Sequence, residues 1–451
     1  MNIPLEDGSR VAVIGGGPAG SLSAYFLLTF ASRVGLDLKV DIFEPRDFTQ
    51  PGPGGCNMCA GIVSESLIQF LASDGINLPT TVVQRGIDSY VLHTDETSVT
   101  IDTPLHEKRI AAVHRGGGPR DVSEVRWGGL DGYLLGLAQQ LGARVVKARV
   151  SDVAWDQGRP QVQLREGPET YDLLVGAIGV NSASWRLFES LGLSYTRPKT
   201  TKAYITELNI GTEDVNRLFG SSMNLFLTDL PRVDFAGIIP KGEFATVCLL
   251  GDDIDSELVE SFFNCDAIKR CFPAAWELQQ GACHCSPWIN VREASKPFMD
   301  RLVLVGDCGA TRLYKDGIGA AYRTAKAAAL AAVFNGVSES DFQEHYLPAY
   351  RAISSDNRYG ELLFGVVHRV HKFRPLIRGV MRMAALEQKN PGMKRRLSII
   401  LWDMFTGSAP YRDIFFRALD PRFWGRFMWE TALAIPGGAT QERKGVEHGH
   451  Q

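Results

Sequence analysis

Apolar and polar positions first form a regular pattern near the amino-terminal end of the chain. The four apolar residues from Val11 to Ile14 are typical of a short buried strand, and the alanine- and leucine-rich residues up to Leu28 are typical of a helix. Three glycines with the spacing G-x-G-x-x-G follow this strand: Gly15, Gly17 and Gly20. Such glycines allow a tight turn, a close approach of the backbone to a pyrophosphate, and close packing of the helix on the strand.

A second strand supports the same interpretation. The run from Leu38 to Phe43 is mostly apolar and ends on Glu44. Dinucleotide-binding folds place an acidic residue about 20 residues after their glycines, where its carboxylate binds the hydroxyl groups of a ribose. The two segments together therefore predict a bound dinucleotide.

Buried strands return much later in the chain. The run from Asp172 to Gly176 is one, and the run from Arg301 to Gly306 is another, which ends on Asp307 and leads to a helical segment up to Phe334. Three segments between these strands alternate apolar and polar residues, as half-buried antiparallel strands do: Thr200 to Ile210, Asn224 to Thr228 and Phe235 to Leu250. The pattern predicts a parallel sheet with a second, largely antiparallel sheet inserted into it.

This pattern divides the chain into parts. Beyond Asp341 it predicts helices, and Gly437 to Gln451 is polar and typical of a disordered tail, whereas His106 to Pro119 is basic, glycine-rich and typical of an exposed loop. We expect the nucleotide-binding domain at 8–85, 119–198 and 295–345, a connecting segment with strands at 86–118, a β-rich domain at 199–294, a helical region at 346–436 and the tail at 437–451.

Charge changes the picture only in the helical region. The 451 residues carry a net charge of −3, which argues against binding to nucleic acid. Glu361 to Glu430, however, holds 13 Lys and Arg against 6 Asp and Glu. Val366 to Arg382 and Ile414 to Trp429 mix basic residues with large apolar ones, which suits an anionic membrane surface. The alternative is that these helices cover the β-rich domain with their arginines in solvent.

Neither export nor a membrane span is expected. Met1 to Arg10 lacks a basic segment of the kind that begins a signal peptide, and the uncharged run from Val11 to Arg33 contains the glycine turn. The eight cysteines are scattered, and the close pairs Cys56/Cys59 and Cys283/Cys285 do not fit a zinc framework. We therefore expect a cytoplasmic protein with reduced thiols and no metal.

In this order, the segments from Gly8 to Tyr350 resemble the FAD-dependent enzymes built like para-hydroxybenzoate hydroxylase, and among them most of all the geranylgeranyl reductases. The glycine fingerprint and Gly306-Asp307 followed by Gly317 are two of the matches. The third, Val175 to Arg186, is similar to the family pattern G-A-D-G-x-x-S-x-x-R-R. Ile178 replaces the acid of that pattern, which argues against direct use of a nicotinamide.

Two narrower matches point to the reductases. Phe235 to Gly242 resembles their substrate element Y-x-W-x-F-P-K-G, with Phe for Tyr and with Gly237 for Trp, which would reshape a lipid pocket. Cys59-Ala60-Gly61 resembles their C-G-G loop, in which a cysteine lies near the flavin. The resemblance implies substrate contacts at Phe235, Gly237, Ile239 and Pro240.

The resemblance also implies FAD as the cofactor, in a discontinuous Rossmann-like α/β domain with an inserted β-rich substrate domain and a helical carboxyl-terminal region. Catalytic candidates are Cys59, whose alternative is a small buried residue, and Tyr314, which with Lys315 could equally be a loop residue. The cofactor-binding residues that it implies are Gly15, Gly17, Pro18, Ala19, Gly20, Glu44, Cys59, Ala60, Gly61, Arg126, Gly306, Asp307, Gly317, Ile318 and Gly319.

The expected activity is reduction of carbon–carbon double bonds in a polyprenyl lipid or an isoprenoid quinone tail. The electrons would come from a reductant such as ferredoxin or NAD(P)H, and the protein would bind the inner face of the membrane peripherally. Two alternatives remain open at this point. One is a flavin-dependent monooxygenase or halogenase of the same fold, and the other is a membrane-associated flavoprotein that carries electrons.

Overall fold

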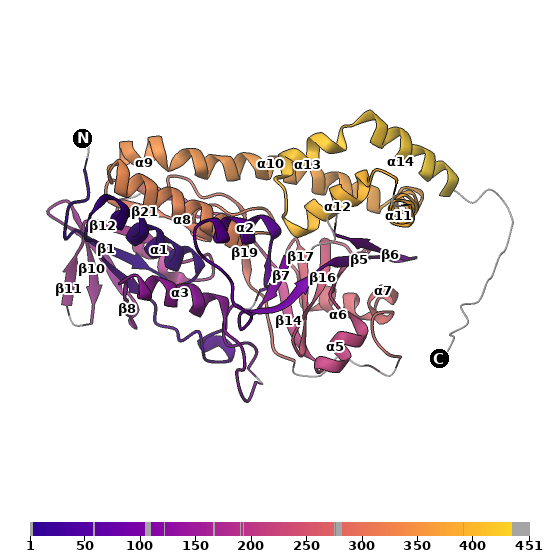
Figure 1. Ribbon diagram of the computed structural model, residues 1–451, viewed down its shortest axis with the longest axis horizontal. Coiled ribbons are helices and arrows are strands. Elements are labelled where there is room, and N and C mark those ends of the chain that lie inside the picture. Colours follow the sequence, from indigo (N-terminus) through magenta and orange to yellow (C-terminus); the bar gives the residue numbers. More distant parts are fainter. Residues whose placement is uncertain are drawn as a thin grey trace.

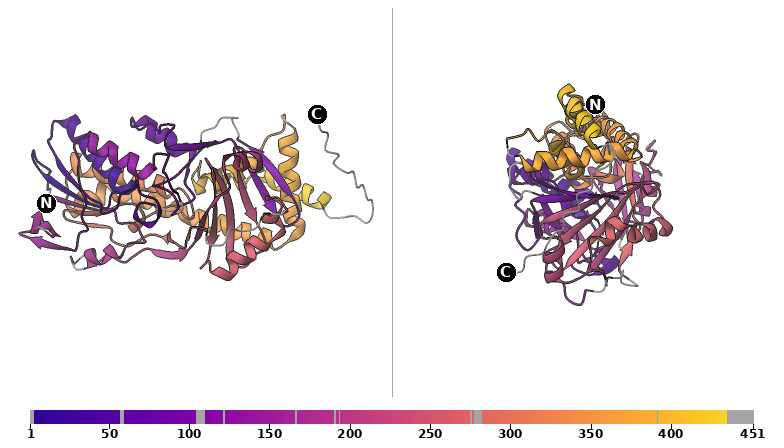
Figure 2. Two further views of the ribbon diagram at one scale, coloured as in Figure 1. Left: turned by 90° about the horizontal axis from the view of Figure 1, so that it is seen from below. Right: turned by 90° about the vertical axis from the view of Figure 1, so that its right-hand side faces the viewer.

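A parallel sheet and a second, antiparallel sheet lie side by side, and a row of helices covers both of them (Figure 1). The computed structural model describes residues 3–56, 59–103, 110–120, 122–165, 167–189, 191–192, 194–274, 276, 282–390 and 392–434. The predicted tail at 437–451 lies outside the described residues. Views from below and from one end show that the carboxyl-terminal helices form a layer on one side of the sheets (Figure 2).

The first sheet is assembled from segments that are far apart in the sequence. Its strand order is β20-β21-β12-β1-β2-β8, and all neighbours are parallel except β20 and β21. The strands are β1 (Arg10–Ile14), β2 (Lys39–Phe43), β8 (Arg144–Val146), β12 (Leu173–Gly176), β20 (Phe298–Met299) and β21 (Leu302–Leu304). This topology confirms the predicted fold class, a discontinuous Rossmann-like domain with an inserted sheet.

Both faces of the first sheet are buried, which is why its strands are apolar throughout. Val11 and Val13 of β1 pack toward α1 (Pro18–Val34), α3 (Leu130–Gln140) and α8 (Gly317–Phe334). Ala12 and Ile14 face the opposite side, where β9 (Asp152–Asp156), β10 (Arg159–Leu164) and β11 (Gly167–Thr170) form a small antiparallel sheet. The sheet is therefore the middle layer of three.

The second sheet has the order β18-β14-β17-β16-β15-β5-β6, and it is antiparallel except for the pair β5 and β15. Its strands are β5 (Ser89–Thr94), β6 (Ser98–Asp102), β14 (Tyr204–Asn209), β15 (Ser222–Leu227), β16 (Val233–Lys241), β17 (Phe244–Gly251) and β18 (His284–Cys285). The predicted segment Phe235 to Leu250 is thus a hairpin of two strands. β5 and β6 come from the connecting segment of the nucleotide-binding domain and join this sheet.

The two faces of the second sheet have different neighbours. On one face lie α5 (Thr212–Leu218), α6 (Ser256–Asn264) and α7 (Asp266–Lys269). The other face packs on the helices α10 (Leu347–His371), α11 (Arg374–Lys389), α12 (Arg396–Thr406), α13 (Tyr411–Ala418) and α14 (Pro421–Ala434). Because α10 runs along both sheets, the helical region joins them into one body (Figure 1). None of the described helices is long and apolar enough to cross a membrane.

Short elements complete the fold. Two small sheets connect the domains, one of β3 (Ile62–Val63), β4 (Val83–Ile87) and β7 (Ile110–Val113) and one of β13 (Lys199–Lys202) and β19 (Trp288–Arg292). The remaining helices are α2 (Glu65–Ser73), α4 (Arg186–Glu189) and α9 (Glu339–His345), with single 3-10 turns η1 (Gly52–Gly54), η2 (Ala183–Trp185) and η3 (Gly306–Cys308).

Candidate active site

A continuous cavity of about 570 Å³ runs from the carboxyl ends of β1 and β2 to the inner face of the second sheet. Glu44 and Arg149 line one end, Asp307 lies in the middle, and Phe235 and Leu250 line the other end. In open α/β sheets a ligand binds beyond the carboxyl ends of the strands, so the first end is where a nucleotide belongs. The cavity therefore extends from a nucleotide site into the second domain.

The glycine turn has the geometry that its spacing predicts. Gly15 has a φ of +104°, and a Cβ atom there would lie 2.5 Å from the carbonyl oxygen of Ala177. A Cβ atom on Gly20 would lie 1.8 Å from the carbonyl oxygen of Gly15, so only glycine lets α1 pack this close to β1. Gly17, by contrast, lines the cavity, and no side chain caps the start of α1. The helix start is thus open to an anion.

Glu44 is held in position at the end of β2. Its carboxylate is buried and accepts hydrogen bonds from the Gly16 backbone N–H at 2.9 Å and from the Arg46 side-chain Nε at 3.0 Å. Arg46 also lines the cavity. A carboxylate fixed at this point fits the hydroxyl groups of a ribose.

Asp307 and the start of α8 form the middle of the site. Asp307 is enclosed at the end of β21, and burial raises the pKa of its carboxyl group. Gly317 and Ile318, in the first turn of α8, line the cavity, and no side chain caps this helix start. A polar group of a ligand here would meet free backbone amides and a carboxyl group together.

Arg115 reaches the cavity, and Arg126 does not. Arg115 donates two hydrogen bonds, of 2.8 and 2.7 Å, to the fully buried carboxylate of Asp131 on α3, and its Nη2 is 3.9 Å from a Cβ placed on Gly17. Burial alone would lower the pKa of Arg115, but Asp131 raises it above its ordinary value. The Arg126 side chain is 80% exposed and pairs with Glu124, which corrects our prediction for that residue.

The position of Arg115 in the cavity lining also corrects the expectation that residues 106–119 form an exposed loop. The described residues of this segment include β7, and the glycines that follow Arg115 are buried. A charged residue beside a strand does not by itself indicate a buried ion pair. The available signal was Asp131, an acid on an otherwise apolar helix, which needs a buried partner.

The loop of Cys59, Ala60 and Gly61 lines the cavity opposite α8. Behind it, Lys241 at the end of β16 donates a 3.3 Å hydrogen bond to the Cys59 carbonyl oxygen and lies 3.5 Å from the Glu207 carboxylate. Lys241 and Glu207 are both almost completely buried, so this ion pair fixes the loop to the second sheet. Sequence reasoning included Lys241 in the matched element Phe235 to Gly242 without giving it a role, and it did not identify Glu207. Burial raises the pKa of Cys56 to about 12, so its thiol stays protonated.

The end of the cavity at the second sheet is apolar. Its lining from that sheet includes Ile205, Met223, Leu225, Phe235, Ile239 and Leu250. Gly237 also lines the cavity between Phe235 and Ile239 on the same strand face, so it leaves space that the tryptophan of the family pattern would fill. Tyr314 and Lys315 line the cavity from the loop before α8.

Most of the sequence-predicted residues thus meet in one cavity. The residues of the predicted set that line it are Gly15, Gly17, Pro18, Ala19, Glu44, Cys59, Ala60, Gly61, Phe235, Gly237, Ile239, Asp307, Tyr314, Gly317 and Ile318. The residues of that set outside the lining are Gly20, Arg126, Pro240, Gly306 and Gly319. Among the described residues, no group of three or more His, Cys, Asp or Glu side chains could hold a metal ion.

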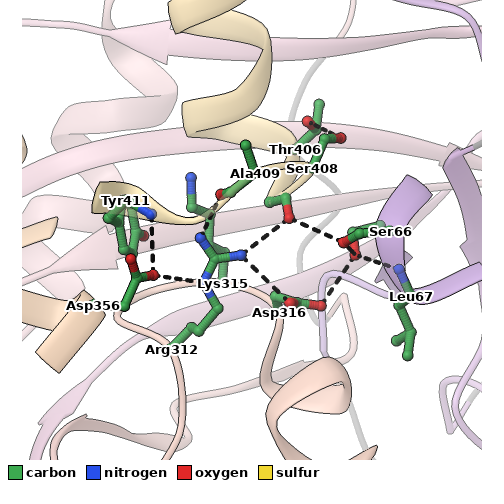
Figure 3. Close-up of polar contacts among 12 residues, drawn as sticks. Ser66, Leu67, Arg312, Lys315, Asp316, Asp356, Thr406, Ser408, Ala409 and Tyr411 are labelled. Atoms are coloured by element: carbon green, nitrogen blue, oxygen red, sulfur yellow. Dashed lines mark hydrogen bonds and ion pairs between the residues drawn. The ribbon is translucent and has the colours of Figure 1, made fainter. Parts of the chain in front are cut away.

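A buried arginine ties the loop before α8 to the carboxyl-terminal helices (Figure 3). Arg312 donates hydrogen bonds to the carbonyl oxygens of Gly407 at 3.0 Å and Ala409 at 2.7 Å. Its guanidinium also lies 3.5 Å from the carboxylates of Asp316 and Asp356. The connection between α12 and α13 is thereby fixed against the loop that carries Tyr314.

The chain shares its fold with solved flavin-dependent proteins, among them a flavoprotein/dehydrogenase and a halogenase in complex with FAD. The residues of the cavity fit FAD. The turn at Gly17 leaves room for a pyrophosphate, and Glu44 is held where a ribose would bind. The free amides at the start of α8 line the same cavity as the loop of Cys59, Ala60 and Gly61. No protein-family model matches the chain, and no curated protein sequence matches it.

Solved structures share the fold at low sequence identity. A flavoprotein/dehydrogenase from Cytophaga hutchinsonii is 15% identical, with 94% of this chain and 98% of that chain covered and a TM-score of 0.61. A mutant of the halogenase PltM in complex with FAD is 14% identical, with 95% and 91% covered and a TM-score of 0.56. A 2-methyl-3-hydroxypyridine-5-carboxylic acid oxygenase is 18% identical, with 79% and 90% covered and a TM-score of 0.54.

Proposed function

We propose that this protein is an FAD-dependent oxidoreductase that reduces carbon–carbon double bonds of a polyprenyl lipid or an isoprenoid quinone tail. The observation that carries the proposal is the continuity of the cavity, which joins a dinucleotide cradle to an apolar chamber. A long hydrocarbon chain that enters the chamber would lie directly beside a flavin held between α8 and the Cys59 loop. The sequence resemblance to the geranylgeranyl reductases supports the same substrate class.

Each part of the cradle has a role in holding FAD. Glu44 would bind the adenosine ribose, and the start of α1 together with Arg115 would bind the pyrophosphate. Asp307 and the amides of α8 would bind the ribityl chain and the flavin ring. When bound and reduced, FAD supplies a hydride, and the protein orients the cofactor and the substrate.

The apolar chamber suits an alkene. An isolated double bond has no polar group through which the protein could hold it, so dispersion contacts and the shape of the chamber must position it. The aliphatic and aromatic lining from the second sheet supplies such contacts and excludes water from the flavin side. This lining supports a substrate in the chamber over a role as an electron carrier alone.

A flavin-dependent monooxygenase or halogenase is the second candidate. The fold likeness to a halogenase and to an oxygenase favours it. An aromatic substrate for such a reaction would occupy the same chamber. Phe235 and Gly237 do not separate the two candidates, because they replace the Tyr and Trp of the reductase element as well as both tryptophans of the halogenase element W-x-W-x-I-P.

The test is anaerobic reduction of the purified protein followed by addition of polyprenyl lipids and mass spectrometry. The proposal expects a mass gain of two hydrogens for each bond reduced, together with reoxidation of the flavin. If the reduced flavin transfers no hydride to any isoprenoid, the proposal fails. A parallel reaction with oxygen, halide and aromatic compounds tests the second candidate, which expects hydroxylated or halogenated products.

We also propose that α13 and α14 bind a membrane surface peripherally. Large apolar side chains stand in solvent on these helices, including Phe416, Leu419, Trp424 and Trp429. Arginines are exposed among them, including Arg412 and Arg422. Exposed tryptophan with arginine suits the interface of an anionic bilayer, from which a lipid substrate would have to come.

A further inference from the structure

Tyr314 is held in an unusual backbone conformation at the apolar end of the cavity. Its φ is +62°, a value that a bulky residue adopts only when its surroundings impose it. The ring packs edge-on against Phe235 of β16 and Phe364 of α10, at 6.3 and 5.2 Å between ring centroids. Tyr314 is the tyrosine among the residues that line this chamber. The strain and the location together indicate a functional position.

A β-bulge brings a carboxyl group to this phenol. In the ladder of β16 and β17, Val233 pairs with Gly251 and Phe235 pairs with Leu250, so Asp234 is the extra residue. A Cβ atom at Gly251 would lie 2.0 Å from the carbonyl oxygen of Arg232, so the bulge requires glycine there. Bulges turn a side chain away from the regular alternation, and here the Asp234 carboxyl comes close enough to the Tyr314 hydroxyl for each group to shift the pKa of the other.

Asp234 lies between the chamber and the surface. The Asp234 side chain is half-buried. Besides Tyr314, two ionisable groups shift its pKa: His368 of α10 and Asp252, which follows β17, and both are exposed. Burial raises the pKa of the Asp234 carboxyl, while the Tyr314 hydroxyl and His368 act in the opposite direction. Burial also raises the pKa of Tyr314, and Asp234, Asp252 and Tyr411 raise it further. Burial thus favours the protonated form of both groups.

We propose that Tyr314 donates the proton that completes alkene reduction and that Asp234 passes a replacement proton to it from the surface. This inference rests on the proposed function. Tyr314 is then a catalytic residue, and Asp234 acts through it as a positioning and relay residue. The inference explains why two backbone irregularities, one at Tyr314 and one at Asp234, meet at the same point.

The proposed step is balanced. The alkene receives a hydride, with its electron pair, at one carbon and a proton at the other, so the double bond becomes a single bond. FAD held in the cradle would supply the hydride after reduction by an external donor such as NAD(P)H or ferredoxin. An isolated alkene has no group that could store the charge of an added hydride, so the phenol must protonate the second carbon as the hydride reaches the first. The phenolate then takes the Asp234 proton, and the Asp234 carboxylate takes one from solvent.

The test compares the wild type with Tyr314→Phe and Asp234→Asn. Protein reduced with dithionite is mixed with a polyprenyl substrate, and flavin reoxidation is followed against pH in H₂O and in D₂O. We expect Tyr314→Phe to slow this step about 100-fold or more, as is typical for loss of a general acid, with unchanged flavin content and unchanged reduction by dithionite. Asp234→Asn should slow it by about 10-fold and flatten its pH profile. Tyr359→Phe, which removes a hydroxyl on α10 outside the cavity lining, is the matched control.

A titration of the Asp234 carboxyl, followed by carbon NMR or infrared difference spectroscopy and identified by its loss in Asp234→Asn, needs no turnover. The relay expects a carboxyl whose pKa lies above the usual Asp range and moves higher still in Tyr314→Phe, because the hydroxyl that favours its charged form is lost. Unchanged titration in Tyr314→Phe, or reoxidation as fast as wild type in that variant, would overturn the relay. If the Asp234 titration changes in Tyr314→Phe but the wild type reduces no alkene, the coupling of Tyr314 and Asp234 is supported. Only the proposal of an alkene substrate is then overturned.

Discussion

Single buried charges decide which residues can reach the cofactor. Arg115 and Arg126 both precede α3, and the family resemblance pointed to Arg126. Only Arg115 has an acidic partner inside the protein, the fully buried Asp131. An ionised carboxylate at such a position needs a paired cation, and the pairing aims the guanidinium at the cavity. Arg126 pairs only with the exposed Glu124 and stays in solvent.

Replacement of Arg115 by Met should therefore remove both flavin and stability. The variant leaves the Asp131 carboxylate buried without its partner, and we expect a loss of about 3–5 kcal/mol in the free energy of unfolding. Flavin content after purification and the urea midpoint measure the two effects. Arg126→Met is the matched control. It should keep the flavin content of the wild type, and its free energy of unfolding should stay within about 0.5 kcal/mol of the wild type. Equal losses in the two variants would contradict the assignment of Arg115.

At the scale of elements, the contact between β1 and α1 has no spare room. Gly20→Ala should force the helix away from the strand, because the added methyl group would meet the Gly15 carbonyl oxygen. We expect loss of bound flavin and destabilisation by about 2–4 kcal/mol, as for other overpacked sites. Gly136→Ala in the middle of α3, where a Cβ atom meets nothing within 4 Å, should instead stabilise by up to about 1 kcal/mol. Thermal melts of the two variants check the contrast.

A carboxylate ties the strands at one edge of the first sheet. Asp41 of β2 accepts two 2.7 Å hydrogen bonds from Arg144 of β8 and one of 2.9 Å from the Tyr171 hydroxyl. Burial alone would raise the pKa of Asp41, but these partners lower it below the ordinary value. The ionised carboxylate is therefore more stable in the folded chain than in the unfolded chain.

This shift predicts a pH-dependent effect of Asp41→Asn. The stabilisation by ionised Asp41 is complete above the unfolded pKa of about 3.9 and declines as the pH falls below it. At pH 7 we expect the variant to lose about 1–2 kcal/mol, a moderate value because Arg144 is exposed and screened by solvent. The difference should shrink at pH 3.5. Urea denaturation at both pH values is the measurement, and an equal difference at both would contradict this account.

For the whole molecule, the layer formed by α10 to α14 both lines one side of the cavity and forms an outer surface of the protein. Phe405 and Thr406 at the end of α12 line the cavity, and Arg312 fixes the residues that follow them. The exposed apolar side chains of α13 and α14 belong to the same layer. A membrane that binds these helices would therefore lie against the helices that line the apolar chamber.

Membrane binding can be measured by flotation with vesicles of phosphatidylglycerol and phosphatidylcholine. We expect the protein to float with mixed vesicles, to bind vesicles of phosphatidylcholine alone more weakly, and to lose binding as salt is raised. Trp424→Ser combined with Trp429→Ser should reduce binding at least 10-fold. Trp288→Ser, which removes an exposed tryptophan on β19, is the matched control. Flotation that is insensitive to the pair of substitutions would place the contact elsewhere.

Sequence reasoning succeeded where the determinants are local. The glycine turn, Glu44 and Asp307 each lie directly after a strand, so periodicity and spacing locate them, and the order of the strands then predicts the first sheet. The pairs that shape the chamber join distant segments. Arg312 bonds to Ala409, 97 residues away, and the bulge at Asp234 arises from a register shift against β17. Local patterns carry no information about such contacts, so only the folded chain reveals them.

The strand order of the first sheet also bears on how the protein is made. β1 pairs with β2, which follows it closely in the chain, but its other neighbour β12 and the next strand β21 are translated much later. Capture of the flavin must then follow translation of Gly317 and Ile318, and closure of the chamber must wait for Phe405. A nascent chain that ends before these residues would expose the apolar wall of the chamber. Until the rest is translated, it would depend on a chaperone to prevent aggregation, since it could not yet bind the cofactor.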